Sequence, residues 1–359
     1  MNTLYRHRHG GVPHNRLTGE CRELIDFSVN ISPLFPPIGN LSLESFSLQS
    51  YPSIDGRGIR EFYSARFGLD KAAVLPLNGS IEGIYLLPRA LGLRRIVAIS
   101  PSFFEYERAG RIAGAEMIFL PLAAENSFRL PAIEEIADLL LNADAFLAAN
   151  PNNPTGTELP PEIILALASR FPDKWFIVDE AFIQFTPAFP HNTLMRKVMA
   201  LKNVIVLHSL TKFYAIPGLR IGALIAHPDL VLRLLDFKEP WTVNAIAESV
   251  AGKLLQCGDY EEKLRVMIFS ERVRIAGLLP MIEGIKLAGG AANFFLAQWQ
   301  RGCSLDALLS YLVKRGIFVR DCRNFSGLED NYFRFAVRSP EENTALLDAL
   351  QAASGSLQS

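Results

Sequence analysis

Short apolar runs alternate with longer amphipathic stretches through the middle of the chain. Several of these runs are apolar throughout, a pattern typical of strands that are covered on both faces of a mostly parallel sheet. The stretches between them are long enough for helices, for example 81–91, 104–113 and 161–170. The predicted strands are 74–77, 95–100, 116–120, 145–149, 175–178, 204–208 and 221–226. Alternation of this kind predicts a large α/β domain over residues 41–256.

The C-terminal part of the chain has a different pattern. Helices are predicted over 228–235 and 243–279, with a break near 239–241. Residues 1–40 are rich in glycine and proline, and we expect them to pack against the rest of the chain without forming a core of their own. The tail is predicted to have strands at 292–299, 317–320 and 332–337 and helices at 305–314 and 340–352. Residues 1–40 and 257–359 together are therefore predicted to form a small α+β domain.

Composition and charge exclude several classes of protein. The 359 residues include 36 basic and 37 acidic side chains, and 49% of them are hydrophobic, which excludes a disordered or fibrous chain. The near-zero net charge argues against a dedicated nucleic-acid binder. No apolar run approaches the roughly 20 residues that a membrane helix needs, and no apolar segment follows residues 6–9 as a secretory signal would require. We therefore expect neither nucleic acid nor a membrane as a partner.

The cysteines are scattered along the chain, at Cys21, Cys257, Cys303 and Cys322. Because no two of them form a C-x-x-C pair, the sequence predicts neither a zinc site nor a disulfide framework, and no metal is expected. Reduced thiols of this kind are typical of cytoplasmic proteins, so we expect a cytoplasmic location.

Polar residues follow four of the predicted strands at the point where each strand ends. The carboxyl ends of parallel strands share one edge of an open α/β sheet, and ligands bind at that edge. Each polar segment alone is also typical of a turn, a helix cap or a solvated surface. Four of them at one predicted edge indicate a shared site. They are Asn78–Gly79–Ser80, the segment 150–156, Asp179–Glu180, and the segment 209–212 with Arg220 eight residues after its Lys212.

The residue types in these segments narrow the chemistry. The sequence lacks the common motifs of P-loop, dinucleotide-binding, zinc-protease and G-x-S-x-G hydrolase sites. An amine, a carboxylate, an amide and an anion cradle around one pocket are what pyridoxal 5'-phosphate requires. Its aldehyde bonds to a lysine, and its ring nitrogen pairs with a carboxylate. Its ring oxygen needs a hydrogen-bond donor, and its phosphate needs helix-start amides and an arginine.

Three motifs resemble those of the fold-type I pyridoxal-phosphate enzymes, close to the histidinol-phosphate aminotransferases: 153–156 (Asn-Pro-Thr-Gly), 179–182 (Asp-Glu-Ala-Phe) and 209–212 (Ser-Leu-Thr-Lys) through Arg220. The run 209–222 is more similar still to the L-threonine-O-3-phosphate decarboxylases of cobalamin biosynthesis, as are segments 9–11, 27–33 and 240–245. The resemblance extends from about residue 9 to residue 345. It implies a mostly parallel central sheet with helices on both faces, plus a small α+β domain.

The resemblance also implies roles for the residues that would hold the cofactor. Lys212 would bond covalently to the cofactor, Asp179 would pair with its ring nitrogen, and Asn153 would donate a hydrogen bond to its ring oxygen. Phe103 would stack on the ring, unless it is an ordinary core aromatic. The phosphate contacts would be Gly79, Ser80, Ser209 and Arg220.

Tyr51 matches a family tyrosine that reaches the cofactor phosphate from the neighbouring subunit. This match implies a homodimer in which each subunit contributes to the other's site.

The substrate implied by the resemblance is a small phosphorylated amino acid. Arg334 matches the arginine that binds the substrate carboxylate, for which a planar guanidinium is well suited. Asn30 lies in a matching substrate-side segment, and His9 and Arg320 match positions that hold the substrate's own phosphate. Alternatively, His9 belongs to a loose terminus and Arg320 is a surface residue. The role of Arg338 is left open, with a surface salt bridge as the simpler interpretation.

Phe182 bears on which reaction is expected. Related aminotransferases have a tyrosine at this position, whereas the threonine-phosphate decarboxylases have phenylalanine; a neutral replacement at an apolar position is the alternative. The expected reaction is decarboxylation of L-threonine O-3-phosphate to (R)-1-amino-2-propanol O-phosphate and carbon dioxide, in cobalamin biosynthesis. The first alternative is a histidinol-phosphate aminotransferase that uses the same cofactor residues. A remote alternative is a binding protein that keeps the fold without turnover.

Overall fold

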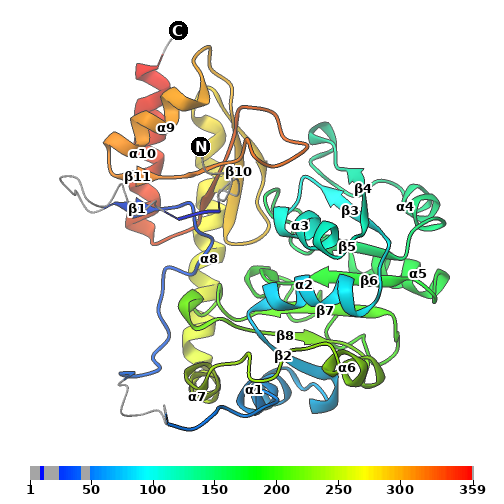
Figure 1. Cartoon of the computed structure of the whole chain (residues 1–359). Coiled ribbons are helices and arrows are strands. Elements are labelled where there is room, and N and C mark those ends of the chain that lie inside the picture. Colours follow the sequence, from blue (N-terminus) through cyan, green and yellow to red (C-terminus); the bar gives the residue numbers. More distant parts are fainter. Residues whose placement is uncertain (1–8, 12–23, 42–48, 358–359) are drawn as a thin grey trace, which may run out of the picture.

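A seven-stranded sheet forms the centre of the larger part of the molecule (Figure 1). The computed structural model describes residues 9–11, 24–41 and 49–357. The strands lie in the order β2-β8-β7-β6-β5-β3-β4, and β8 runs antiparallel to its two neighbours while the other described neighbours in this sheet are parallel. Their bounds are β2 Val74–Asn78, β3 Arg95–Ser100, β4 Glu116–Pro121, β5 Ala145–Ala149, β6 Trp175–Asp179, β7 Val204–Ser209 and β8 Ile221–Ile225.

Helices cover both faces of this sheet. Alternate residues of a strand point to opposite faces, so Ile96 and Ala98 of β3 belong to one hydrophobic core and Val97 and Ile99 to the other. Burial on both sides explains why these strands are apolar throughout, and it confirms the predicted architecture. One face is covered by α2 (Ser80–Ala90), α3 (Phe104–Ile112) and α6 (Pro228–Leu235). The other is covered by α1 (Arg57–Phe67), α4 (Ile133–Leu140), α5 (Pro161–Arg170) and α7 (Ala245–Leu254).

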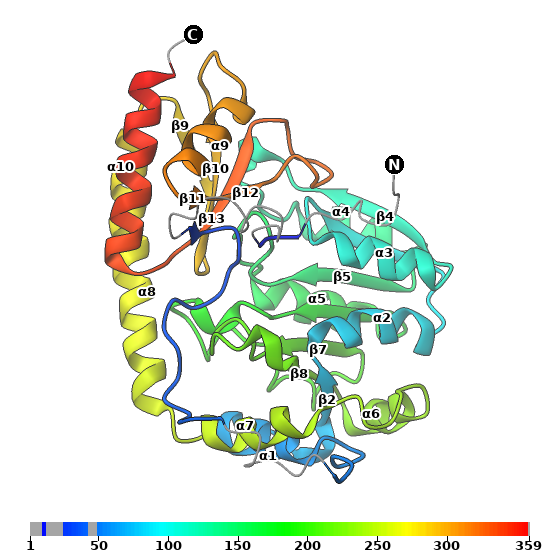
Figure 2. The ribbon, with the colours of Figure 1, turned by 60° about the vertical axis from the view of Figure 1, so that its left-hand side comes forward.

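A second, antiparallel sheet with the order β12-β13-β10-β9 lies in the C-terminal part of the chain. Its strands are β9 Ile285–Gly289, β10 Phe294–Trp299, β12 Arg320–Asp321 and β13 Tyr332–Ala336. The helices of this part are α8 Gly258–Leu278, α9 Leu305–Lys314 and α10 Pro340–Ser356, and Figure 2 shows α8 and α10 side by side. From the N-terminal segment, β1 (Ile25–Asp26) pairs in parallel with β11 (Ile317–Phe318), and Phe27 is fully buried.

In the C-terminal part of the chain, the structure differs from the sequence predictions in three elements. The helix predicted over 243–279 is two helices, because α7 ends near Leu255 and α8 begins at Gly258 with two acidic side chains in its first turn, a favourable helix start. The strand predicted over 317–320 is divided between β11 and β12, which pair in different sheets. Strand β9 was not predicted. The division into domains 41–256 and 1–40 plus 257–359 stays a prediction.

None of the helices in the described ranges combines the length and the apolar character that crossing a membrane requires. The described cysteines Cys257, Cys303 and Cys322 are free thiols, and Cys21 lies outside the described residues.

Candidate active site

Strand register brings the polar segments to one edge of the large sheet. Ala149 of β5 pairs with Asp179 of β6, and Asp179 pairs in turn with Leu207 of β7, so these three strands end at the same level. Because β8 is antiparallel, it begins where the others end, and its pairing of Gly222 with Ser209 carries Arg220 to the same edge. The antiparallel pairing of β2 with β8 also places Asn78 there, directly before α2.

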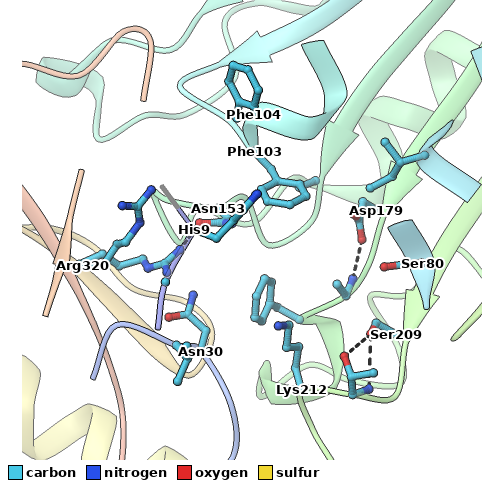
Figure 3. Close-up of a pocket in the computed structure, with 18 of the residues that line it drawn as sticks. His9, Asn30, Ser80, Phe103, Phe104, Asn153, Asp179, Ser209, Lys212 and Arg320 are labelled. Carbon is cyan, nitrogen blue, oxygen red and sulfur yellow. Dashed lines mark hydrogen bonds between the residues drawn. The ribbon is translucent and has the colours of Figure 1, made fainter. Parts of the chain in front are cut away.

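A cavity of about 300 Å³ opens at this edge, facing the C-terminal part of the chain. The predicted residues that line it are His9, Asn30, Ser80, Phe103, Asn153, Asp179, Ser209, Lys212, Arg220, Arg320 and Arg334. Figure 3 shows two groups facing one another: Ser80, Asp179, Ser209 and Lys212 on the side of the large sheet, and His9, Asn30 and Arg320 opposite. Residues distant in the sequence therefore share one pocket.

Asp179 is held by two hydrogen bonds at the end of β6. Its Oδ2 accepts from the Tyr106 hydroxyl at 2.9 Å, and its Oδ1 accepts from the Ala181 N–H at 3.0 Å. Burial raises the pKa of the Asp179 carboxyl to about 6, although both hydrogen bonds and the positive charge of Lys212 act to lower it. An ionised carboxylate in such a site favours a positively charged partner, as a protonated pyridine nitrogen would be.

Lys212 lines the same pocket and is partly buried. Burial, together with the positive charges of Arg220 and Arg334, lowers the pKa of the Lys212 amine to about 8, against the opposing effect of Asp179. A lowered pKa increases the fraction of neutral, nucleophilic amine near neutral pH. The pocket therefore supplies the amine that an aldehyde cofactor needs.

The start of α2 and the residue before β8 form an anion cradle. Gly79 has a φ of 75°, and a Cβ at this position would lie 2.4 Å from Nη2 of Arg220, so the guanidinium occupies the space that a side chain would fill. Ser80 begins the helix, whose first N–H groups have no partner within the helix. The Ser209 hydroxyl lies 2.8 Å from that of Thr211. Amides, hydroxyls and a guanidinium at one point fit a phosphate group.

Two buried arginines line the cavity, and Arg320 lies on the side opposite the large sheet (Figure 3). Arg334 donates through Nη1 to Oδ1 of Asn153 and through Nη2 to the Ser28 carbonyl at 3.0 Å. Arg320 donates to Oδ1 of Asn324 at 2.8 Å. Burial, followed by the positive charge of Arg320, lowers the pKa of Arg334 to about 10. Two buried cations in one pocket are costly unless anions bind there.

Asn30 lies against the same cavity with its amide buried. Within the described ranges, neither its Oδ1 nor its Nδ2 has a hydrogen-bond partner. Buried amides in native proteins are nearly always satisfied, so an amide left this way at a cavity wall indicates a polar ligand. Together with the cradle at Gly79, this amide shows that the residues present fit a phosphorylated cofactor and a polar substrate.

Two phenylalanines complete the lining. Phe103 comes directly before α3 and packs edge-on against Tyr106, with ring centroids 5.6 Å apart. Phe182 is 8% exposed and packs edge-on against Phe294 at 5.1 Å. The guanidinium of Arg334 lies 5.4 Å from the centroid of the same Phe294 ring. Position 182 thus contributes an edge-on aromatic contact and no tyrosine hydroxyl.

Tyr51 and Arg338 do not line the cavity. Tyr51 is 83% exposed, and its ring packs 5.1 Å from that of Trp241. Arg338 donates to the Asp26 carbonyl at 3.1 Å and to Glu342 at 2.8 Å, so it joins the start of α10 to β1. This inter-element role goes beyond the surface salt bridge suggested by the sequence.

Sequence reasoning missed several residues that the structure brings to the cavity. Tyr106 is the most informative, because it bonds to Asp179 and lies in the first turn of the helix predicted over 104–113, three residues after Phe103. Ser28 and Thr211 lie in segments 27–33 and 209–212, which carry the resemblance, whereas Asn324 and Phe325 had no such signal. Within the described residues, no group of three or more His, Cys, Asp or Glu side chains could hold a metal ion.

Known proteins are similar to this chain over nearly its whole length. The family pattern described as aminotransferase class I and II matches residues 25–350. A protein of Caldanaerobacter subterraneus subsp. tengcongensis, assigned as a threonine-phosphate decarboxylase, is 35% identical over 90% of this chain and 88% of its own length. The threonine-phosphate decarboxylase of Salmonella typhimurium is 32% identical over 97% of both chains. Histidinol-phosphate aminotransferases of Desulfitobacterium hafniense and other bacteria are 30% identical.

Solved structures of both kinds of enzyme are similar to this chain. The histidinol-phosphate aminotransferase of Clostridium acetobutylicum superposes with a TM-score of 0.85 at 29% identity, covering 93% of this chain and 100% of its own. The L-threonine-O-3-phosphate decarboxylase of Porphyromonas gingivalis superposes with a TM-score of 0.78 at 28% identity, covering 91% and 98%. Sequence identity thus favours the decarboxylases, and backbone similarity favours the aminotransferase.

Proposed function

We propose that this chain, which belongs to the aminotransferase class I and II family, is a decarboxylase of L-threonine O-3-phosphate. The products would be (R)-1-amino-2-propanol O-phosphate and carbon dioxide, and the metabolic setting would be cobalamin biosynthesis. The chain is an enzyme that depends on pyridoxal 5'-phosphate, as its family and its relatives are. When bound, this cofactor takes up the electron pair left by a bond that breaks at the substrate's α-carbon.

Each predicted cofactor residue has a place in the proposal. Lys212 would bond to the cofactor aldehyde, supported by its place in the cavity and by the lowered pKa of its amine. Asp179 would pair with the ring nitrogen, supported by a carboxylate that Tyr106 and Ala181 already orient. Phe103 would lie against the ring, and Asn153 would donate to the ring oxygen. The phosphate would bind Gly79, Ser80, Ser209 and Arg220 at the start of α2.

The substrate residues would act by positioning. Arg334 would bind the carboxylate, and Arg320, His9 and Asn30 would bind the phosphate at the other end of the molecule. Attachment at both ends fixes the rotation of the α-carbon, and that rotation selects which of its bonds breaks. After the carboxylate leaves, Nζ of Lys212 would return a proton to the same carbon. The residues that bind the two ends therefore choose the reaction.

Phe182 is the observation that carries the choice of decarboxylation. Its ring packs against Phe294, and Asn153, which lines the cavity, would be the side chain that donates to the cofactor's ring oxygen. The relatives named threonine-phosphate decarboxylase support the same choice. Histidinol-phosphate transamination is the second candidate, favoured by the higher TM-score of the aminotransferase structure.

Product analysis separates the two candidates. The holoenzyme is incubated with O-phospho-L-threonine alone, and in parallel with L-histidinol phosphate and 2-oxoglutarate. We expect carbon dioxide from the first mixture and no glutamate from the second. Glutamate formation without carbon dioxide would reverse the assignment.

The proposed assembly is a homodimer in which Tyr51 reaches the phosphate of the partner's cofactor. The exposure of Tyr51 and its position outside the cavity of its own chain support this arrangement. Light scattering on the purified protein should give twice the mass of 39.8 kDa. Mixing Lys212→Ala and Tyr51→Phe subunits should restore some activity, because one hybrid site would have both residues intact; a monomer would show no such rescue.

A further inference from the structure

Glu105 is a buried carboxylate that the reaction described above does not use. It lies in the first turn of α3, is 4% exposed, and does not line the cavity. Its Oε2 accepts hydrogen bonds from the Tyr85 hydroxyl and from Arg108, the latter at 3.3 Å, and its Oε1 lies 3.1 Å from Nε2 of His9. Arg108 also donates to the Tyr85 hydroxyl at 2.7 Å. Oε2 is therefore bound to side chains of α2 and α3, whereas Oε1 faces His9 in the N-terminal segment.

The charge of Glu105 is maintained despite its burial. Burial acts to raise the pKa of the Glu105 carboxyl, but the hydrogen bonds from Tyr85 and Arg108 and the charge of His9 outweigh it, and the pKa is lowered. A carboxylate oxygen only accepts, so Nε2 of His9 donates to Oε1 of Glu105. With Nε2 directed at Glu105, Nδ1 is the ring nitrogen left to face a ligand in the cavity.

The segment 9–11 has a second anchor on the other side of the cavity. Gly11 donates its N–H to the Ser28 hydroxyl at 2.7 Å, and a Cβ on Gly10 would lie 2.3 Å from the Ser28 carbonyl oxygen, so only glycine allows this approach. The same carbonyl accepts from Arg334. Segment 9–11 therefore extends from the substrate-side arginine to α3.

His9 lies at the α3 end of this segment. Its ring is 5.9 Å from that of Phe103, it lines the cavity, and its side chain is 52% exposed. A half-exposed imidazole has many accessible rotamers, so a fixed partner is needed to hold it over the pocket. Within the described residues, the Glu105 carboxylate lies within ion-pair distance of the His9 ring.

We propose that Glu105 is a positioning residue for recognition of the substrate phosphate, because it draws His9 across the mouth of the cavity and orients its second nitrogen toward the phosphate. The inference rests on the proposed function for the identity of the anion. The contact by which Glu105 fixes segment 9–11, through His9, does not depend on which substrate binds. Glu105 would touch neither cofactor nor substrate.

The first test measures how firmly segment 9–11 is fixed, by hydrogen exchange at the Gly10 and Gly11 amides of the holoenzyme. Glu105→Gln removes the charge with little change in shape, and Glu107→Gln, on the same helix and paired with Arg111, is the matched control. We expect faster exchange in Glu105→Gln and no change in Glu107→Gln. Unchanged exchange in a folded Glu105→Gln protein would overturn the inference. If Glu105→Gln lowers the melting temperature by several degrees, His9→Ala takes its place and should give the same faster exchange.

The second test measures recognition with a double-mutant cycle. Glu105→Gln should raise KM for O-phospho-L-threonine about ten-fold and change kcat less than about two-fold, because a charge-assisted contact is lost before the chemistry. In a His9→Ala background, the Glu105→Gln substitution should not raise KM any further. An equal rise in KM in both backgrounds would contradict the role assigned to Glu105. If the unsubstituted enzyme releases no carbon dioxide, the proposed function fails, and the exchange experiment alone decides the role of Glu105.

Discussion

Replacing Tyr106 by phenylalanine removes one hydrogen bond from the carboxylate that would face the cofactor's ring nitrogen. The Tyr106 hydroxyl donates to Oδ2 of Asp179 at 2.9 Å, and both side chains are buried. The pKa of Asp179 is already raised to about 6 by burial, and the Tyr106 bond is the first of the effects that oppose this rise. Without it, the pKa of Asp179 should rise further, toward and past neutral pH.

The size of the effect follows from the strength of such a bond. Hydrogen bonds to charged groups contribute about 1.5–3 kcal/mol, and each 1.4 kcal/mol is a factor of ten in affinity, so cofactor binding at pH 7 should weaken about ten- to a hundred-fold. The sign of the pH dependence is fixed by the same argument. A protonated Asp179 cannot pair with a charged ring nitrogen, so the variant should regain affinity as the pH rises from 6 to 8 and the carboxyl ionises.

The assay is titration of the apoenzyme with pyridoxal 5'-phosphate at several pH values, followed by absorbance. The unsubstituted protein should lose affinity only as the pH falls through about 6, where its own Asp179 becomes protonated. Tyr63→Phe is the matched control, because Tyr63 is also buried and bonds to His208 at 2.8 Å, away from the cavity. A Tyr106→Phe protein with the affinity and pH profile of the unsubstituted protein would refute the reasoning.

Three further substitutions test the proposed roles of cofactor-site residues. Lys212→Ala should abolish turnover while the circular dichroism spectrum stays the same, and measurable turnover would exclude Lys212 as the covalent partner. Arg220→Ala should weaken cofactor retention on dialysis by about ten-fold or more, because a guanidinium–phosphate contact is charge-assisted; unchanged retention would remove Arg220 from the phosphate site. Phe182→Tyr should move some turnover from carbon dioxide release toward transamination, and an unchanged product ratio would mean that Phe182 does not determine the reaction.

The sequence predicted the large sheet well because its signal is local. Strands β3, β5 and β7 are apolar on both faces, and each predicted range lies within one residue of the observed bounds. The polar segments after β5, β6 and β7 could be assigned to one edge, because the carboxyl ends of parallel strands lie at the same edge of a sheet. The convergence of Asn153, Asp179 and Lys212 on one cavity therefore followed from the sequence alone.

Other features depend on tertiary packing and could not be predicted. The division of 317–320 between β11 and β12 reflects pairing with strands of two different sheets, β1 and β13, which no local pattern encodes. The contact of Tyr106 with Asp179 joins residues 73 positions apart in the sequence, and that of Glu105 with His9 joins residues 96 positions apart. The proposed role of Tyr51 depends on a partner subunit, so a single chain places it only on the surface.

The fate of the α-carbon's hydrogen tests the central claim most directly. The holoenzyme is incubated with O-phospho-L-threonine in deuterium oxide, and the product is examined by proton NMR. Decarboxylation predicts 1-amino-2-propanol O-phosphate that keeps its original α-hydrogen and gains one deuterium on the same carbon, because solvent supplies the proton that replaces the carboxylate. A 2-oxo acid that keeps its carboxylate and has lost the α-hydrogen would contradict the account.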